Sequence, residues 1–340
     1  MSIIYSEDCG RSETTPKVTF LVVSYNQARF VEDAVRAALS QDYPSLEVLL
    51  SDDCSTDGSF GIMERLASEY RGSHRVVLNR NPRNLGIGAH VNRVMELATG
   101  ELIIASAGDD VSFTTRASRI VSAWTAYGRK PDCICSMVIR MSPDGIDLGL
   151  NEFRTHNLWH DQAYVARHGG CTLGAANAWT RRLWDAFGPI NSLVINEDIV
   201  IPFRASLMGG VCFVYEPLVR YRFGMGTWRP KLGKTRPQAA RRARLHQQFD
   251  RDVHSSAQAL ADVRVVGDTS LIALAEVRLQ EAEILRDLCQ GSWVSPTQLA
   301  REIGRGASIR RIAGAVMRAY LPVPEWLVSR MQRLTNHSEM

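Results

Sequence analysis

The sequence predicts an α/β protein in which a doubly wound, mostly parallel sheet is followed by a helical C-terminal region. Three observations support this prediction. Short apolar runs alternate with segments of helical periodicity through the first part of the chain, which is typical of a parallel sheet with helices on both faces. Polar residues follow several of these runs directly, where ligands bind in such sheets. Beyond residue 237 almost all of the sequence has helical character.

The elements are expected in a regular order. Four segments are short, apolar and rich in β-branched residues, as buried strands are: 17–25, 46–52, 75–79 and 101–107. The segments between them carry apolar residues at helical spacing and are expected to be helices. They are 28–40, a helix with Ile62, Leu66 and Tyr70 on one face, and 88–98. Later in the chain we expect strands within 133–140, 171–179 and 210–223, and a short helix over 199–208.

Length and charge indicate two parts. The 340 residues suffice for one large domain and an accessory region, and the Gly-, Pro- and base-rich stretch 224–237 marks the boundary. We therefore expect one part over 1–228, called the catalytic part because it holds all the candidate catalytic residues described below, and a basic linker with helices over 229–340. Residues 229–340 hold 18 Lys+Arg against 11 Asp+Glu, a charge of +7, so the remaining 22 and 25 give the first part −3. This asymmetry favours two different partners.

The cysteines and the hydropathy favour a cytoplasmic protein. The seven cysteines are scattered, and the spacing of Cys133 and Cys135 is not that of a zinc ribbon or a redox pair. Reduced thiols are therefore expected. No apolar run approaches the length of about 18 residues that a membrane-spanning helix needs, and the first residues carry acids rather than the basic region of a secretory signal.

The adjacent Asp109 and Asp110 follow the apolar run 101–107. One interpretation is a turn that uses aspartate for local hydrogen bonds. The other is a site for a hard cation, because Mg²⁺ or Mn²⁺ binds through one or two carboxylates together with substrate phosphates. The position at a strand end and the absence of a glycine-rich phosphate loop in the sequence favour the cation site.

Two further carboxylate groups are candidates. Asp53 follows the predicted strand 46–52 and is expected to have oxygens free for the N–H of a base or for a ribose hydroxyl. Glu197 and Asp198 precede a predicted helix. Asp198 is interpreted as an N-cap, as a general base that takes a proton from an attacking hydroxyl, or as both.

Three stretches together resemble glycosyltransferase family 2 enzymes of the A-type fold: "VSYNQARFVEDAVRAALSQDYPSLEVLLSDDCSTDGS", "NPRNLGIGAHVNRVMELATGELIIASAGDDV" and "NEDIVIPFR". The resemblance covers about residues 16–223. It implies a nucleotide-sugar donor, UDP-sugar by preference, a divalent Mn²⁺ or Mg²⁺ and inversion at the anomeric carbon. The sequence lacks the QxxRW-type signature and the spanning helices of processive synthases, which favours transfer of a single sugar. The acceptor that the resemblance implies is a hydroxyl of a glycan or of a lipid-linked acceptor in surface polysaccharide or glycoconjugate synthesis.

The resemblance also implies the donor site. Val23 and Tyr25 would border the nucleotide base, and Asp53 would hydrogen-bond it. Asp109 would contact the ribose or a metal-bound water and contribute to the metal site. Asp110 would ligate the metal that bridges the two phosphates.

In the third stretch, Asp198 would be the catalytic base, with Glu197 beside it and Arg204 as the trailing, donor-binding arginine of the motif. The sequence departs from the family in one place. Many relatives carry a histidine in the segment that corresponds to 221–228, and this chain has none there. The candidates for the missing positive charge are Arg222, Arg229 and Lys231.

The basic C-terminal region has open alternatives. Segment 229–244 holds seven positive residues and no acid, which fits a solvated linker or a loop that closes over an anionic donor. Segments 308–320 and 325–334 are amphipathic and basic, so they can pack on the catalytic part or lie on an anionic membrane surface. Aromatic residues are not interleaved with the basic ones, so no nucleic-acid partner is expected. The rival functions are a nucleotidyltransferase and a non-catalytic nucleotide-sugar-binding scaffold.

Overall fold

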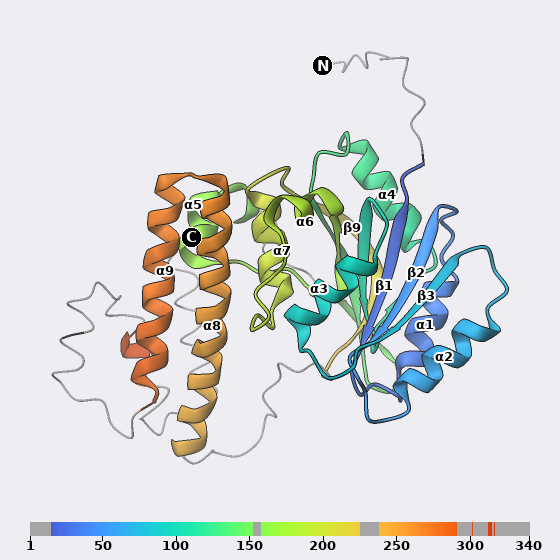
Figure 1. Ribbon diagram of the computed structural model, residues 1–340, viewed down its shortest axis with the longest axis horizontal. Helices are drawn as coiled ribbons and strands as arrows, with labels where there is room; N and C mark the ends of the chain where they lie inside the picture. Colours follow the sequence, from blue (N-terminus) through green and yellow to red (C-terminus); the bar gives the residue numbers. More distant parts are fainter. Residues whose placement is uncertain are drawn as a thin grey trace.

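The computed structural model describes residues 15–151, 158–224 and 238–290, together with residues 301, 312–314 and 316. A sheet with helices on both sides forms one part, and a pair of long antiparallel helices lies beside it (Figure 1). The fold class expected from the sequence is confirmed. None of the helices in the described ranges combines the length and the apolar character that crossing a membrane would require.

The sheet contains strands in the order β3-β2-β1-β4-β8-β6-β9-β5, and β7 pairs with β6 outside this path. Their bounds are β1 Val18–Ser24, β2 Leu46–Asp52, β3 Arg75–Arg80, β4 Leu102–Ala107, β5 Val111–Ser112, β6 Cys133–Met141, β7 Asp147–Asn151, β8 Asn177–Thr180 and β9 Val211–Arg222. Strands β3, β2, β1 and β4 are parallel to one another, whereas β8 is antiparallel to both β4 and β6.

Helices cover both faces of the sheet. Their bounds are α1 Val31–Leu39, α2 Ser59–Glu69, α3 Ile87–Leu97, α4 Arg116–Ala126, α5 Gln162–His168, α6 Arg181–Phe187, α7 Glu197–Ser206, α8 Gln238–Val266 and α9 Thr269–Leu288, with short 3₁₀ turns at η1 Leu158–His160 and η2 Gly174–Ala176. Helices α1, α2 and α4 contribute to the core on one face. Helices α3, α6 and α7 contribute to the core on the other face, which makes the sheet doubly wound.

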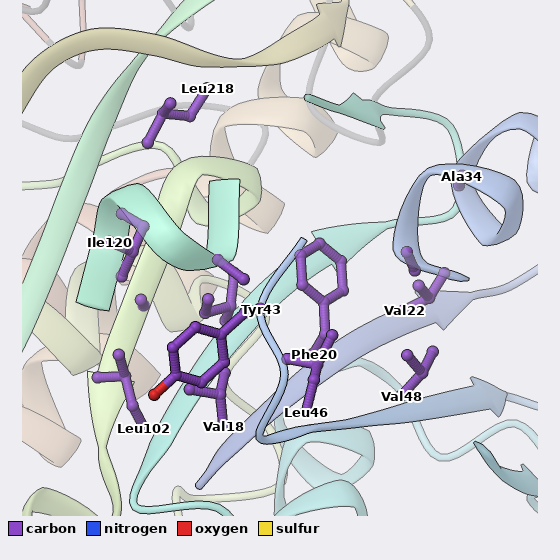
Figure 2. Close-up of a cluster of buried hydrophobic side chains, with 14 of the residues drawn as sticks. Val18, Phe20, Val22, Ala34, Tyr43, Leu46, Val48, Leu102, Ile120 and Leu218 are labelled. Carbon is purple, nitrogen blue, oxygen red and sulfur yellow. The ribbon is translucent and has the colours of Figure 1, made fainter. Parts of the chain in front are cut away.

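The central strands are apolar because both of their faces are covered. Phe20 and Val22 of β1 point into the first core together with Val48 of β2 (Figure 2), and Leu21 and Leu49 between them point into the second. A strand buried on both faces has no polar alternation. This explains why these strands could be predicted from continuous apolar runs.

One sequence expectation was only partly correct. A strand was expected within the apolar segment 171–179, but Gly174–Ala176 form the turn η2 and the strand β8 begins only at Asn177 and ends at Thr180. The turn packs against β4, β6 and β9. A buried turn of small apolar residues has the same composition as a short buried strand, so composition did not distinguish them.

Helices α8 and α9 pack against each other and then on the catalytic part of the chain. Figure 1 shows α7 between this helix pair and the sheet, and α5 close to α9. Phe203 of α7 shares a core with Leu260 and Val263 of α8. The expected boundary at residue 229 and most of the basic segment 229–244 lie outside the described residues, as do nearly all of 308–340.

Candidate active site

The carboxyl ends of β1, β2 and β4 bring the predicted donor residues together. The register pairs Val23 with Ser51 of β2 and with Ala107 of β4. Val23 is partly buried, and Tyr25, just beyond the strand, is 45% exposed. An exposed aromatic ring at this position is suited to stacking on a planar base.

The loops after β1 and β2 are joined by hydrogen bonds. The main-chain N–H of Asn26 donates to Ser55 Oγ, and its side-chain oxygen accepts from the N–H of Thr56, both over 2.8 Å. Asp57 accepts from the N–H of Ala28 over 3.0 Å. Asn26 has a φ of 53°, a left-handed conformation that asparagine tolerates better than most residues. The two loops therefore form one surface beside Tyr25.

Asp53 is not free, contrary to the expectation from the sequence. Its Oδ1 accepts hydrogen bonds from Asn81 Nδ2 and the N–H of Leu85, and its Oδ2 accepts from the N–H of Gly86, over 2.8 to 3.0 Å. Asp53 directly follows β2, and its buried carboxylate contacts the loop between β3 and α3. In this structure its observed contacts hold that loop, and its contact with a base stays a prediction.

Asp109 and Asp110 lie in the turn between β4 and β5, buried to 9% and 1% exposure. Burial raises the pKa of Asp109, and burial together with the charge of Asp109 raises that of Asp110 well above its usual range. Asp110 Oδ1 accepts from the N–H of Arg222 over 2.7 Å, but its buried Oδ2 receives no hydrogen bond within the described part of the chain. A buried oxygen without a donor is suited to a cation.

Two buried arginines lie beside the aspartate pair. Arg222 Nε donates to the main-chain oxygen of Asp109 over 2.9 Å, and its Nη1 donates to that of Pro143 over 2.8 Å. Arg116 is fully buried, and its charge attracts that of Asp110. Of the three candidates for the missing positive charge, Arg222 thus lies against the aspartate pair, and Arg229 and Lys231 lie outside the described residues.

Glu197 and Asp198 form the first turn of α7, after Asn196 at its N-cap position. Burial raises the pKa of Glu197 to about 8, with a further contribution from the charge of Asp198. Burial raises the pKa of Asp198 to about 6, opposed by hydrogen bonds from its own main chain and that of Gly174. At neutral pH, therefore, Asp198 is ionised and Glu197 is protonated.

A series of contacts joins the aspartate pair to Asp198. Arg116 Nη2 donates to the main-chain oxygen of Asn177 over 3.3 Å, and Asn177 Nδ2 donates to Thr172 Oγ1 over 2.7 Å. The N–H of Thr172 donates to the main-chain oxygen of Asp198 over 3.0 Å. A hydrogen-bonded framework therefore connects the elements that carry the two carboxylate pairs, and their joint action in one site stays a prediction.

The comparison with known proteins identifies the family of the segment that carries most of these residues. Residues 19–182, which hold β1 to β8 and every predicted donor residue except Arg204, match the family model described as Glycosyl transferase family 2. This segment is a glycosyltransferase family 2 domain.

Two curated relatives from Bacillus subtilis share part of the family 2 domain. The glycosyltransferase EpsE is 36% identical over 107 residues, which is 32% of this chain and 38% of EpsE. The teichuronic acid biosynthesis glycosyltransferase TuaG is 33% identical over 95 residues, which is 28% of this chain and 36% of TuaG. The aligned part thus spans well under half of either relative.

Solved structures share the fold over most of the chain. The mannosyltransferase PcManGT from Pyrobaculum calidifontis, in complex with GDP-Man and Mn²⁺, is 18% identical with a TM-score of 0.54, over 91% of this chain and 86% of that one. TarS 1–349 of S. aureus, in complex with UDP-GlcNAc, is 14% identical with a TM-score of 0.55, over 88% and 90%. These similarities confirm the A-type glycosyltransferase fold.

Arg204 does not contact the donor site of the family 2 domain in this structure, contrary to the expectation. It lies at the last turn of α7, about 10 Å along the helix axis from Glu197 at the rise of an α-helix. Its fully buried guanidinium pairs with Asp262 of α8 over 3.1 Å and donates to the main-chain oxygen of Gly188 over 2.7 Å. The observed contacts assign it to the interface with the helical region.

Sequence reasoning missed Arg116, Thr172 and Asn177. Each looks ordinary in its own segment, because Arg116 contacts Asn177 across 61 positions and Thr172 contacts Asp198 across 26. A surface cavity of about 410 Å³ lies at the opposite edge of the sheet, between the end of α4 and the start of β9. Its lining contains none of the predicted site residues.

Proposed function

We propose that the protein is an inverting glycosyltransferase that moves one sugar from a nucleoside diphosphate sugar, a UDP-sugar by preference, to a hydroxyl of a glycan or lipid-linked acceptor. One observation carries this proposal. The buried Asp109–Asp110 pair, with an oxygen that receives no hydrogen bond among the described residues, is joined through Arg116, Asn177 and Thr172 to the main chain of Asp198. A cation site and a general base are the two groups that such a transfer needs.

The donor is proposed to bind over the carboxyl ends of β1, β2 and β4. Tyr25 offers an exposed ring for the base, and the loops joined by Asn26 surround it. Asp109 and Asp110 would hold Mn²⁺ or Mg²⁺, since these ions prefer oxygen ligands. Among the described residues no three His, Cys, Asp or Glu side chains cluster as a metal site, so donor phosphates complete the ligand set in this proposal. When bound, the ion stabilises negative charge on the leaving diphosphate.

Asp198 is proposed as the base. With a pKa of about 6 it is ionised at neutral pH and basic enough to accept the proton of an acceptor hydroxyl. Glu197, with a pKa of about 8, stays protonated and therefore avoids a second negative charge beside the base.

The biological setting is part of the proposal. The family 2 domain and relatives such as TuaG, named for teichuronic acid biosynthesis, support a role in polysaccharide or glycoconjugate synthesis. A cytoplasmic location and peripheral membrane contact through the basic C-terminal helices remain predictions, since the segments that carry the latter lie almost wholly outside the described residues.

Calorimetric titration of UDP, GDP, dTDP and CDP tests the proposal, first with Mn²⁺ and then with EDTA. We expect one diphosphate to bind only with the metal, and its sugar conjugate to be consumed when a hydroxyl acceptor is present. A triphosphate that binds far better than its diphosphate would support a nucleotidyltransferase instead. Metal-dependent binding of a nucleotide sugar without turnover on any acceptor would support the non-catalytic scaffold.

A further inference from the structure

We propose that helix α8 positions the catalytic helix α7 through Gln258 and Asp262, so that the helix pair α8–α9 is part of the catalytic apparatus. The inference rests on the proposed function, because it concerns the geometry of Asp198. Gln258 and Asp262 lie one turn apart on α8 and are both buried against the catalytic part of the chain.

The contacts form one buried network. Asp262 accepts from Arg204 Nε through Oδ2 over 3.1 Å and from Gln258 Nε2 through Oδ1 over 2.9 Å. Gln258 Oε1 in turn accepts from the main-chain N–H of Asn191 over 2.7 Å. Arg204 also donates to the main-chain oxygen of Gly188. Helix α8 is therefore bonded to α7 and also to the loop 188–196 that leads into it.

The same loop is held from its other side by α3. The N–H of Gly88 donates to the main-chain oxygen of Val194 over 3.0 Å, and Asn92 exchanges two hydrogen bonds with the main chain of Ile190, over 2.7 and 2.8 Å. Glu197 follows this loop directly. The loop that sets where α7 begins is thus fixed between α3, which lies within the family match, and α8, which lies beyond it, as do the loop and α7 themselves.

Charge explains why this network specifies a position. Arg204 and Asp262 are 0% and 1% exposed. A buried ion pair contributes little net stability to the folded protein, but separating its partners is strongly destabilising because it leaves a buried charge unpaired. Helix α8 and α7 therefore have one favoured alignment. A displacement of about 1 Å at a catalytic group can reduce turnover about 100-fold, so that alignment matters for Asp198.

Two substitutions and a matched control test the inference. Asp262→Asn keeps the shape of the side chain and removes its charge, and Gln258→Leu removes the acceptor for Asn191. The control is Glu281→Gln, which breaks the 2.9 Å ion pair between Arg167 of α5 and α9. This pair also joins the helix pair to the catalytic part of the chain, but it does not contact the loop 188–196.

We expect Asp262→Asn and Gln258→Leu to lower kcat at least tenfold, with the Kd of the metal-dependent diphosphate within twofold of the wild type. Hydrogen exchange in a peptide covering residues 188–200 should speed up in both. In Glu281→Gln, kcat and exchange in that peptide should stay within twofold of the wild type. This should hold even if the Tm of Glu281→Gln falls as much as the Tm of the two test variants. If Asp262→Asn does not fold, Gln258→Leu, which leaves the ion pair in place, decides the question.

Two results would overturn the inference. One is unchanged exchange and kcat in Gln258→Leu and in folded Asp262→Asn. The other is that Glu281→Gln loses as much kcat as Asp262→Asn and Gln258→Leu when its Tm falls by the same amount. The helix pair would then only stabilise the fold and would not position α7. A wild-type protein that transfers no sugar would contradict the proposed function. In that case hydrogen exchange in residues 188–200 would still decide whether α8 fixes the loop 188–196.

Discussion

Arg116 Nη2 donates a hydrogen bond to the main-chain oxygen of Asn177, in a part of the interior where neither residue is accessible to solvent. Arg116 belongs to the helix that follows the aspartate pair, and Asn177 begins the strand that follows the turn beside Asp198. The carboxylates on the donor side and the proposed base are consequently held by one interior framework rather than by independent loops.

Substitutions of Asp110 and Asp198 are predicted to affect different steps, diphosphate binding and sugar transfer respectively. Asp110→Ala should abolish metal-dependent binding of the diphosphate, because it removes the buried oxygen available to the cation. Asp198→Asn should keep that binding and lower transfer at least 100-fold, because an amide cannot take the proton. Calorimetry and a turnover assay on both variants check this. Equal loss of binding in the two variants would contradict the division of roles.

Transfer is predicted to depend on pH through Asp198. Its pKa of about 6 means that the base becomes protonated below this pH, so log kcat should fall with a slope near one as the pH drops from 6 to 5. The rate must be measured at saturating metal and donor, since protonation of Asp109 and Asp110 weakens binding separately. A kcat that stays constant down to pH 5 would exclude Asp198 as the base.

Glu197 is predicted to make stability fall with rising pH. Its pKa is raised to about 8 in the folded protein from a usual 4.5, so the folded state binds the extra proton between these values and loses stability as the pH rises through them. Glu197→Gln cannot ionise. It should therefore be more stable than the wild type at pH 8.5, by about 1–3 kcal/mol, and indistinguishable near pH 4.5. Urea unfolding at both pH values measures the difference.

Asp53→Ala is predicted to destabilise the protein. It leaves the N–H of Leu85 and the amide of Asn81 without their acceptor and removes one of the two acceptors of the Gly86 N–H, at a cost of about 2–4 kcal/mol. The control is Asn84→Ala, which removes one exposed hydrogen bond to Gly86 and should cost about 0.5 kcal/mol. Unchanged stability with weakened diphosphate binding would show instead that Asp53 acts on the base.

Gly174→Ala is predicted to lower transfer more than donor binding. A Cβ built at Gly174 would overlap Glu197 Oε1, so the Glu197 carboxyl must move, whereas Asp198 Cβ, at 3.5 Å, would be in ordinary contact with it. Gly61→Ala is the control, because a Cβ there meets nothing within 4 Å and alanine favours the helix. We expect at least a tenfold fall in kcat for the first variant and none for the second. Equal kcat values for Gly174→Ala and Gly61→Ala would mean that the Glu197 side chain moves aside without displacing Asp198.

The sequence allowed the strands and the carboxylates to be predicted, because each is a local pattern. Strands β1, β2 and β4 are covered on both faces and so appear as uninterrupted apolar runs. Asp109–Asp110 and Glu197–Asp198 are adjacent pairs at the ends of elements, so their position along the chain already indicates a shared edge of the sheet.

The partners of these residues could not be predicted in the same way. The bond between Arg204 and Asp262 spans 58 positions, and that between Arg222 and Asp109 spans 113. Neither leaves a periodic signal, because each depends on how complete elements pack. For this reason Arg204 was expected at the donor, and Asp53 was expected to have free oxygens, although both side chains are engaged in structural contacts.

The antiparallel strand β8 has a consequence for synthesis of the chain. It closes the gap between β4 and β6 in the middle of the sheet, although residues 177–180 emerge from the ribosome long after β4. Until then a nascent domain presents the main-chain edge of β4, a template for pairing with other chains. Fragments of the domain that stop short of Thr180, where β8 ends, should therefore aggregate.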